Sequence, residues 1–143
     1  DSPLIVERRE LLTDSGGPGK QRGALGRREV FRVPDDEHAP QPPVNLGIQS
    51  GRFRLPPEGL FGGGPGAKAR FLVNGQTGNP YGLTRLKPGD VVIMDAAGGG
   101  GYGHPKDRDR DQVIRDVRDG KVSRESALQE YGVEITDEIL DMK

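Results

Sequence analysis

The sequence predicts a mainly β (α+β) fold, in which a β-rich, loop-heavy body is followed by a short C-terminal helical tail. Short apolar runs recur at a spacing typical of strands, and clusters of glycine and proline, which favour loops, separate them. After residue 105 the pattern of apolar residues changes. They now stand three and four positions apart, as on one face of a helix. We therefore expect a body over residues 1–105 and a tail over residues 106–143, packed together as a single domain.

The strands are predicted where β-branched, aromatic and other apolar residues stand between turn residues. These segments are residues 4–12, 25–33, 44–50, 69–74 and 91–94, with residues 83–86 as a further candidate. The run Val91-Val92-Ile93-Met94 is continuously apolar, so we expect it to be buried on both faces of the sheet. Before it, Lys87-Pro88-Gly89-Asp90 has the Pro and Gly positions of a type II turn.

Three glycine clusters, at residues 13–19, 62–66 and 98–103, lie between predicted strands rather than at the chain ends. Glycine admits positive φ and allows another backbone or a ligand to come close, but ordering it costs conformational entropy. We therefore expect these loops to pack against something, either a partner chain or a ligand at the boundary between two chains, with packing against a partner favoured. Residues 38–43 are expected to be an extended linker because they contain three prolines.

The tail is predicted to contain two short helices and a final turn. Asp109 is the expected N-cap of a helix over residues 110–119, which Gly120 ends. Ser123 is the expected cap of a second helix that ends at Gly132, and Thr136 starts the final turn. The residues expected to face inward are Val113, Ile114, Val117, Ala127, Leu128 and Tyr131. Because two such helices cannot bury a core of their own, residue 105 separates sub-regions and not independent domains.

Composition limits the function classes. The chain has 143 residues, of which only 31 % are apolar, against the usual ~45–50 %, so its own core must be thin and a partner surface is expected to complete it. It has no cysteine, which excludes disulfides, thiolate catalysis and cysteine-based zinc sites. A net charge of −1 does not indicate the basic surface that binding of nucleic acid usually needs. Neither a membrane span nor a signal peptide is visible. We expect a cytoplasmic protein.

No segment of the sequence meets all the requirements of a nucleotide-binding or metal-binding motif. Residues 98–103 match G-x-G-x-x-G, but a dinucleotide site needs a helix directly after the last glycine, where His104 and Pro105 stand. Gly19-Lys20 resembles a P-loop only superficially, because two required positions of that motif are wrong. The two histidines are far apart and lack ligand spacing, and the alternating charges of residues 106–111 are interpreted as a solvated helix entrance. We assign no catalytic, metal or cofactor-binding residue to this chain.

Several segments, taken together and in order, resemble the hydantoinase B family. They are residues 10–19 with 22–26, residues 56–63, residues 86–90 followed by 98–103, and residues 116–123 running to 131–133. That family includes N-methylhydantoinase B, the matching part of 5-oxoprolinase, and the acetone and acetophenone carboxylases. Its members usually have a much longer chain. This sequence resembles only their C-terminal portion, as a separate chain, and is most similar to the small (beta) subunit that accompanies the acetophenone carboxylases.

The resemblance implies a small, non-autonomous subunit of an ATP-dependent ketone carboxylase complex, which forms a β-keto acid from ketone, bicarbonate and ATP. ATP, Mg²⁺ and bicarbonate would belong to the whole complex and not to this chain. The implied partners are a hydantoinase A-type subunit, which would hold the ATP site, and a truncated hydantoinase B-type subunit. A subunit of an amide-ring hydrolase of the hydantoinase or 5-oxoprolinase type, and a purely structural scaffold, are the alternatives.

The resemblance also marks loop positions as candidates for an interface or for contact with a ligand, with no catalytic role carried over. These candidates are Asp14, Arg22, Arg52, Gly62, Gly63, Gly100, Gly101, Tyr102 and His104.

Overall fold

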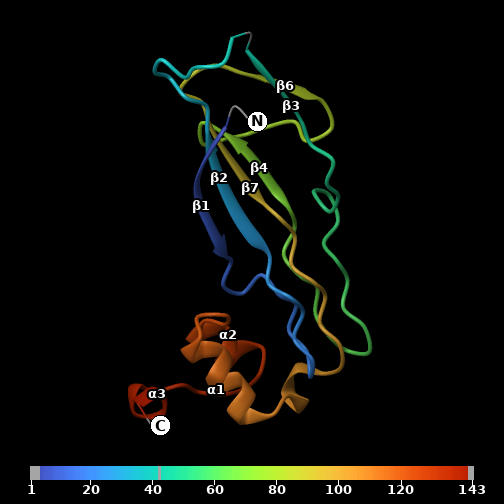
Figure 1. Cartoon of the computed structure of the whole chain (residues 1–143). Coiled ribbons are helices and arrows are strands. Elements are labelled where there is room, and N and C mark those ends of the chain that lie inside the picture. The colour runs from blue at the N-terminus through green and yellow to red at the C-terminus, as the bar shows by residue number, and fades with distance from the viewer. Residues whose placement is uncertain (1–3, 42, 142–143) are drawn as a thin grey trace.

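The computed structural model of the chain describes residues 4–41 and 43–141. The elements follow one another along the length of the molecule (Figure 1). A two-stranded sheet lies at one end, a five-stranded sheet occupies the middle, and the helices lie at the other end. This arrangement confirms the predicted β-rich α+β fold with a C-terminal helical tail.

The five-stranded sheet is antiparallel throughout. It is formed by β1 (Ile5–Leu11), β2 (Arg27–Arg32), β7 (Val91–Asp95), β4 (Arg70–Val73) and β5 (Gln76–Thr77), in that spatial order. The end of β1, the start of β2, the end of β7 and the start of β4 come together at one end of the sheet. The glycine-rich segments are attached to these four strand ends.

The smaller sheet pairs β3 (Val44–Gly47) with β6 (Leu83–Leu86), and both segments were predicted as strands. It closes a core on one face of the large sheet. The buried residues of this core are Val33, Phe71, Leu86 and Val92. Since successive side chains of a strand point to opposite faces, Val91 and Ile93 lie on the other face and stay half-buried. The prediction that β7 is buried on both faces is therefore wrong.

Two turns show how local sequence sets the strand connections. Gly89 has a φ of +85°, and Asp90 donates its backbone N–H to the carbonyl oxygen of Lys87 (3.1 Å), which confirms the predicted type II turn. Asn74 and Gly75 have φ values of +50° and +78°, as a type I′ hairpin requires, and join β4 to β5. The predicted strand ended at Asn74, so β5 was missed.

The tail consists of a 3₁₀ turn (Pro105–Asp107), α1 (Arg110–Arg118), α2 (Arg124–Gln129) and α3 (Asp137–Asp141). The Asp109 side chain accepts the backbone N–H of Gln112, which confirms this N-cap. The Ser123 hydroxyl accepts the N–H of Ser126 in the same way. None of the helices among the described residues has the length and apolar character needed to cross a membrane.

The tail buries a small cluster of its own, contrary to the expectation that its helices could not. The buried members are Val113, Val122, Ala127, Tyr131 and Ile135. The cluster forms because the segments that connect the helices supply Val122, Tyr131 and Ile135 in addition to the helical residues. Leu128, which was expected to face inward, is exposed. The division into a body and a tail of one folding domain stays a prediction.

Candidate functional site

Three segments run on from the strand ends at the lower end of the large sheet (Figure 1). Residues 14–26 connect β1 to β2, residues 57–67 precede β4, and residues 96–103 follow β7. We call these three segments the glycine bundle. They contain nearly all of the three glycine clusters that stand out in the sequence.

Backbone hydrogen bonds tie each segment of the glycine bundle to the other two. Gly17 donates its N–H to the carbonyl oxygen of Gly99 (2.8 Å). Gly64 donates to Pro18 (2.7 Å), and Gly101 donates to Gly64 (2.9 Å). The bundle is therefore a cross-linked unit even though its segments are outside the regular sheet.

The absence of side chains is what permits this packing. A Cβ atom placed on Gly101 would overlap the carbonyl oxygen of Pro18, and one placed on Gly63 would overlap that of Gly101. A Cβ on Gly100 would likewise meet the carbonyl oxygen of Glu58. A partner or a ligand was expected against these glycines. The structure instead places other backbone of the same chain there.

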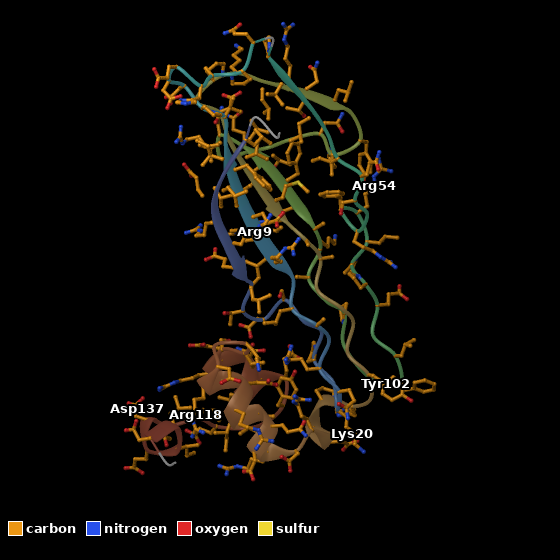
Figure 2. The ribbon with its side chains drawn as sticks, in the orientation of Figure 1. Arg9, Lys20, Arg54, Tyr102, Arg118 and Asp137 are labelled. Carbon is orange, nitrogen blue, oxygen red and sulfur yellow. The ribbon has the colours of Figure 1, made fainter. Side chains whose placement is uncertain are left out.

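At its far end the glycine bundle presents three large apolar side chains, Leu60, Phe61 and Tyr102, which we call the tip. Their exposed fractions are 61 %, 78 % and 52 %. The rings of Phe61 and Tyr102 are in contact, with centroids 5.2 Å apart. Figure 2 shows Tyr102 directed away from the ribbon at the end of the bundle. An apolar group that is exposed and held in place is typical of a contact surface.

A tight turn directs Phe61 outward. Phe61 and Gly62 have φ values of +51° and +89°, and Gly63 donates its N–H to the carbonyl oxygen of Leu60 (3.0 Å). The left-handed conformation costs a residue with a side chain roughly 1–2 kcal/mol. The backbone bonds around Leu60, which link it to Gly101 (2.9 Å) and Gly103 (2.9 Å), keep the turn in place despite that cost.

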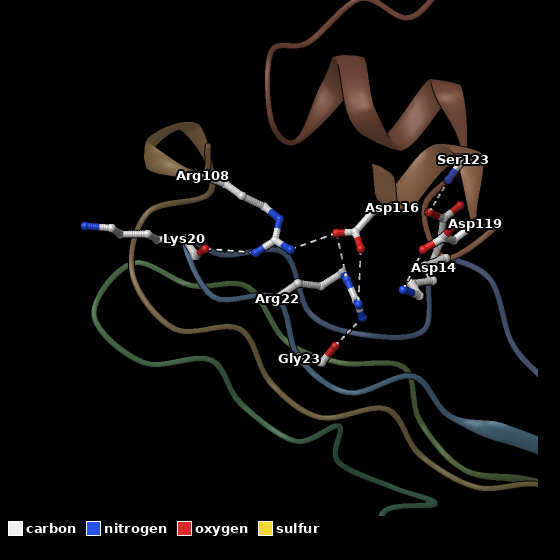
Figure 3. Close-up of polar contacts among 9 residues, drawn as sticks. Asp14, Lys20, Arg22, Gly23, Arg108, Asp116, Asp119 and Ser123 are labelled. Atoms are coloured by element: carbon white, nitrogen blue, oxygen red, sulfur yellow. Dashed lines mark hydrogen bonds and ion pairs between the residues drawn. The ribbon is translucent and has the colours of Figure 1, made fainter. Parts of the chain in front are cut away.

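An ion cluster joins the glycine bundle to the tail, and we call its members Arg22, Arg108 and Asp116 the clamp (Figure 3). Arg22 donates from Nε to Oδ2 of Asp116 (3.1 Å), and Arg108 donates to the same oxygen from Nη2 (2.9 Å). These side chains are 14 %, 9 % and 7 % exposed, in the order Arg22, Arg108, Asp116. Two guanidinium groups thus share one buried carboxylate, which is the group that compensates their charge.

Other contacts hold the tail on the same bundle segment. The carboxylate of Asp14 accepts the backbone N–H of Ser123 (2.8 Å), and Asp14 donates its own N–H to the carbonyl oxygen of Lys121 (3.1 Å). The phenol of Tyr131 lies close enough to the backbone of Gly19 for that backbone to influence its pKa. Burial raises the pKa of this phenol, and the nearby positive charges of the clamp act in the opposite direction.

A polar cleft of about 450 Å³ lies along this junction, between α2 and the glycine bundle. Asp14 and Tyr131 are among its lining residues. Within residues 4–41 and 43–141, no three His, Asp or Glu side chains are placed to hold a metal ion together.

A second buried ion group lies on the large sheet. Arg28 binds both carboxylate oxygens of Asp95 (2.7 and 2.8 Å), and Arg70 reaches Oδ2 of Asp95 at 3.0 Å. The hydrogen bonds and positive charge of Arg28, followed by those of Arg70, lower the pKa of the Asp95 carboxyl. These bonds join β2, β7 and β4 where the glycine bundle begins.

The structure brings together most of the residues that the sequence marked as candidates. Asp14 and Arg22 bind the tail, whereas Gly63, Gly100 and Gly101 lie inside the glycine bundle. Gly62, Tyr102 and His104 lie at or beside the tip, where the backbone of His104 is 3.7 Å from a Cβ position on Gly62.

Arg52 is elsewhere, with a φ of +69° and its carbonyl oxygen bonded to Ala69 beside β4. The role of all these candidates in binding stays a prediction.

Sequence reasoning missed Arg108, Asp116 and the tip residue Phe61. Residues 106–111 were interpreted as a solvated run, which is wrong for Arg108 because this side chain is inserted into the clamp. A usable signal was the position of Asp116, three residues after Val113, which places a charge on the apolar face of α1. The turn residues Phe61-Gly62 carry no comparable signal.

Comparison with known proteins identifies the family. The sequence model of the family described as hydantoinase B/oxoprolinase matches residues 1–105. The beta chain of the caprolactamase of Pseudomonas jessenii is 37 % identical over 93 % of this chain and 23 % of its own length. A protein of Pseudomonas sp. (strain NS671), provisionally named as the B component of a D-/L-hydantoinase, is 32 % identical over 94 % of this chain and 23 % of its own length.

Solved structures show the same fold. The ATP-dependent caprolactamase of Pseudomonas jessenii matches with a TM-score of 0.71 and 32 % identity, over 95 % of this chain and 24 % of that one. Nucleotide-free acetone carboxylase matches with a TM-score of 0.71 and 24 % identity, over 94 % of this chain and 22 % of that one. The chain spans about a quarter of the length of the relatives that it matches. On the family match and these identities, the chain belongs to the hydantoinase B/oxoprolinase family.

Proposed function

We propose that this chain is a mainly structural, non-autonomous component of an ATP-dependent assembly, and that the tip contacts another subunit. The observation that carries this proposal is the tip itself. Leu60, Phe61 and Tyr102 expose apolar surface at the end of a bundle that is cross-linked by backbone bonds. A surface that is ordered before binding loses little entropy when a partner covers it, which favours association.

The partners we propose are a hydantoinase A-type subunit and a truncated hydantoinase B-type subunit. Two relatives are themselves named as subunits, the hydantoinase component and the caprolactamase beta chain. They also contain, in one chain, about four times the length matched here, which supports a larger B-type body as a neighbour. ATP and Mg²⁺ would be bound by the other subunits of such an assembly.

For the reaction, the named relatives favour ring opening of a cyclic amide. Both of these relatives, which are above 30 % identity, take their names from cyclic amide substrates, hydantoin and caprolactam. In such a reaction ATP would phosphorylate the carbonyl oxygen of the amide and release ADP. Water would then add to the ring carbon, the ring C–N bond would break with the nitrogen leaving as an amine, and a second water would hydrolyse the resulting acyl phosphate to a carboxylate and phosphate. A hydrolase component is therefore our first candidate.

An ATP-dependent ketone carboxylase of the acetophenone type is the second candidate. It is supported by the sequence segments that resemble the hydantoinase B family. The acetone carboxylase match is 24 % identical, so it supports this candidate through the fold alone. Here ATP would activate ketone and bicarbonate before the C–C bond forms, and the product would be a β-keto acid. A scaffold without any role in the reaction is the remaining alternative.

Association is tested by co-expressing the tagged chain with A-type and B-type subunits and measuring what co-purifies. We expect the wild type to capture both, and Phe61→Ser with Tyr102→Ser to reduce capture at least tenfold. Leu83→Ser is the matched control, because Leu83 is 80 % exposed on β6, at the other end of the molecule. A wild-type chain that folds cooperatively and stays monomeric beside these subunits would show that obligate association is wrong.

The reaction is tested on the intact assembly with ATP, by following incorporation of labelled bicarbonate and opening of a lactam or hydantoin ring in parallel. Ring opening without bicarbonate incorporation supports the hydrolase, and the reverse result supports the carboxylase. Tyr102→Phe and His104→Ala then test whether this chain takes part in the reaction or serves only as a scaffold. Unaltered turnover of an assembly that contains both changes would favour the scaffold.

A further inference from the structure

We propose that Arg108 is a positioning residue that fixes the exposed tip from inside the tail, so that docking of the tail and binding of a partner are coupled. The proposal of a partner at the tip is taken from the proposed function. The positioning step is independent of it, since it concerns contacts within this chain.

Arg108 makes one bond within the tail, to α1, and one bond to the glycine bundle. Its Nη2 donates to Oδ2 of Asp116 on α1 (2.9 Å), and its Nη1 donates to the backbone carbonyl oxygen of Lys20 (3.0 Å). Figure 3 shows this side chain lying between the two acceptors. The guanidinium group therefore fixes the position of the Lys20 backbone relative to α1.

From Lys20 the path to the tip consists of backbone bonds alone. Lys20 donates its N–H to the carbonyl oxygen of Gly103 (3.1 Å). Gln21 and Tyr102 exchange N–H···O bonds of 2.9 Å in both directions. Gly103 in turn donates to the carbonyl oxygen of Leu60 (2.9 Å). Arg108 thus contacts the residue that begins this ladder, and the ladder carries the Leu60 and Tyr102 side chains of the tip.

The segment that contains Lys20 needs such external support. It has glycine at positions 16, 17, 19 and 23, and glycine loses more conformational freedom on ordering than any other residue. The tail lies against both sides of Lys20: Asp116 binds Arg22, and the phenol of Tyr131 lies near the backbone of Gly19. Because a coupling free energy is reciprocal, a partner that orders the tip would also hold the tail more firmly in place.

The test uses Arg108→Gln. This change removes the guanidinium group that donates to Lys20 and Asp116, but it leaves Arg22 paired with Asp116. Amide hydrogen exchange of the full chain is followed residue by residue by NMR. We expect exchange at Gln21, Tyr102 and Gly103 to become at least tenfold faster, with amides of β4 and β7 unchanged. Arg110→Gln is the matched control, since it makes the same change at an exposed position on the first turn of α1. Arg110→Gln should leave the exchange rates of these three amides, which serve as reporters, unaltered.

Reporter rates within twofold of wild type in Arg108→Gln overturn the proposal, as does acceleration that extends equally to β4 and β7. The coupling is then measured by capture of the B-type subunit, which should fall at least fivefold in Arg108→Gln and stay unchanged in Arg110→Gln. Faster exchange with undiminished capture overturns the coupling. Failure of the wild-type chain to be captured is a different result, which contradicts the proposed function and not the positioning role.

Discussion

The carboxylate of Asp116 on α1 accepts a hydrogen bond from Arg22, which lies 94 residues earlier in the chain. This bond joins the helical tail to a glycine-rich loop that begins directly after β1. Arg108 completes the same cluster from the start of the tail. The polar clamp therefore links two parts of the molecule that have separate apolar clusters.

Asp116→Asn should destabilise the protein by about 3–5 kcal/mol, because it leaves the buried guanidinium groups of Arg22 and Arg108 without a compensating charge. Urea unfolding followed by circular dichroism measures this. Asp119→Asn is the control, since Asp119 pairs with Lys121 at the exposed end of α1. Its unfolding midpoint should match the wild type. Equal midpoints for all three proteins would contradict the assigned role of Asp116.

Gly98→Ala should lower stability by about 1–3 kcal/mol or prevent folding, because its Cβ would overlap the carbonyl oxygen of Ser15 and the backbone cannot move aside without strain. Gly51→Ala is the matched control. No atom lies within 4 Å of a Cβ at Gly51, so this change should be tolerated. Thermal unfolding of the two variants compares them directly. Similar melting temperatures would show that the bundle is looser than described.

Asp95 should make part of the stability depend on pH. Its pKa is lowered in the folded protein, so its contribution is complete above the unfolded carboxyl pKa of about 3.9 and is lost as the pH falls through the folded value. Asp95→Asn removes that contribution at every pH. The stability difference between wild type and variant should therefore be constant near neutral pH and shrink below about pH 4. Urea titrations across this range test it, and a constant difference would refute it.

Tyr131 should ionise at unusually high pH, because burial raises the pKa of its phenol. The neutral phenol is the form that the folded state favours, so its contribution is present below about pH 10 and lost as the pH rises through the folded pKa. Ultraviolet absorbance of tyrosinate during alkaline titration detects this late step. Tyr131→Phe should remove it. A titration curve of the same shape at high pH in the variant would contradict the assignment.

Local sequence predicted those features that depend on neighbouring residues. The caps Asp109 and Ser123, and the turn at Gly89, follow from side-chain acceptors or backbone preferences within a few positions, and each is confirmed. The hairpin at Asn74-Gly75 was readable by the same reasoning and was missed. Leu128 was placed inward by its spacing, but it is exposed because the connecting segments supply the rest of that cluster.

The amino-acid order therefore sets the β-rich body, the helical tail and the three glycine segments, since strand, helix and turn preferences act over short distances. It also contains the motifs that indicated the hydantoinase B family. What packs against Gly63 and Gly101, and where the charge of Asp116 is compensated, depends on segments far apart in the sequence. Those pairings arise from the common end of the β1, β2, β7 and β4 strands, a relationship that exists only after the sheet has formed.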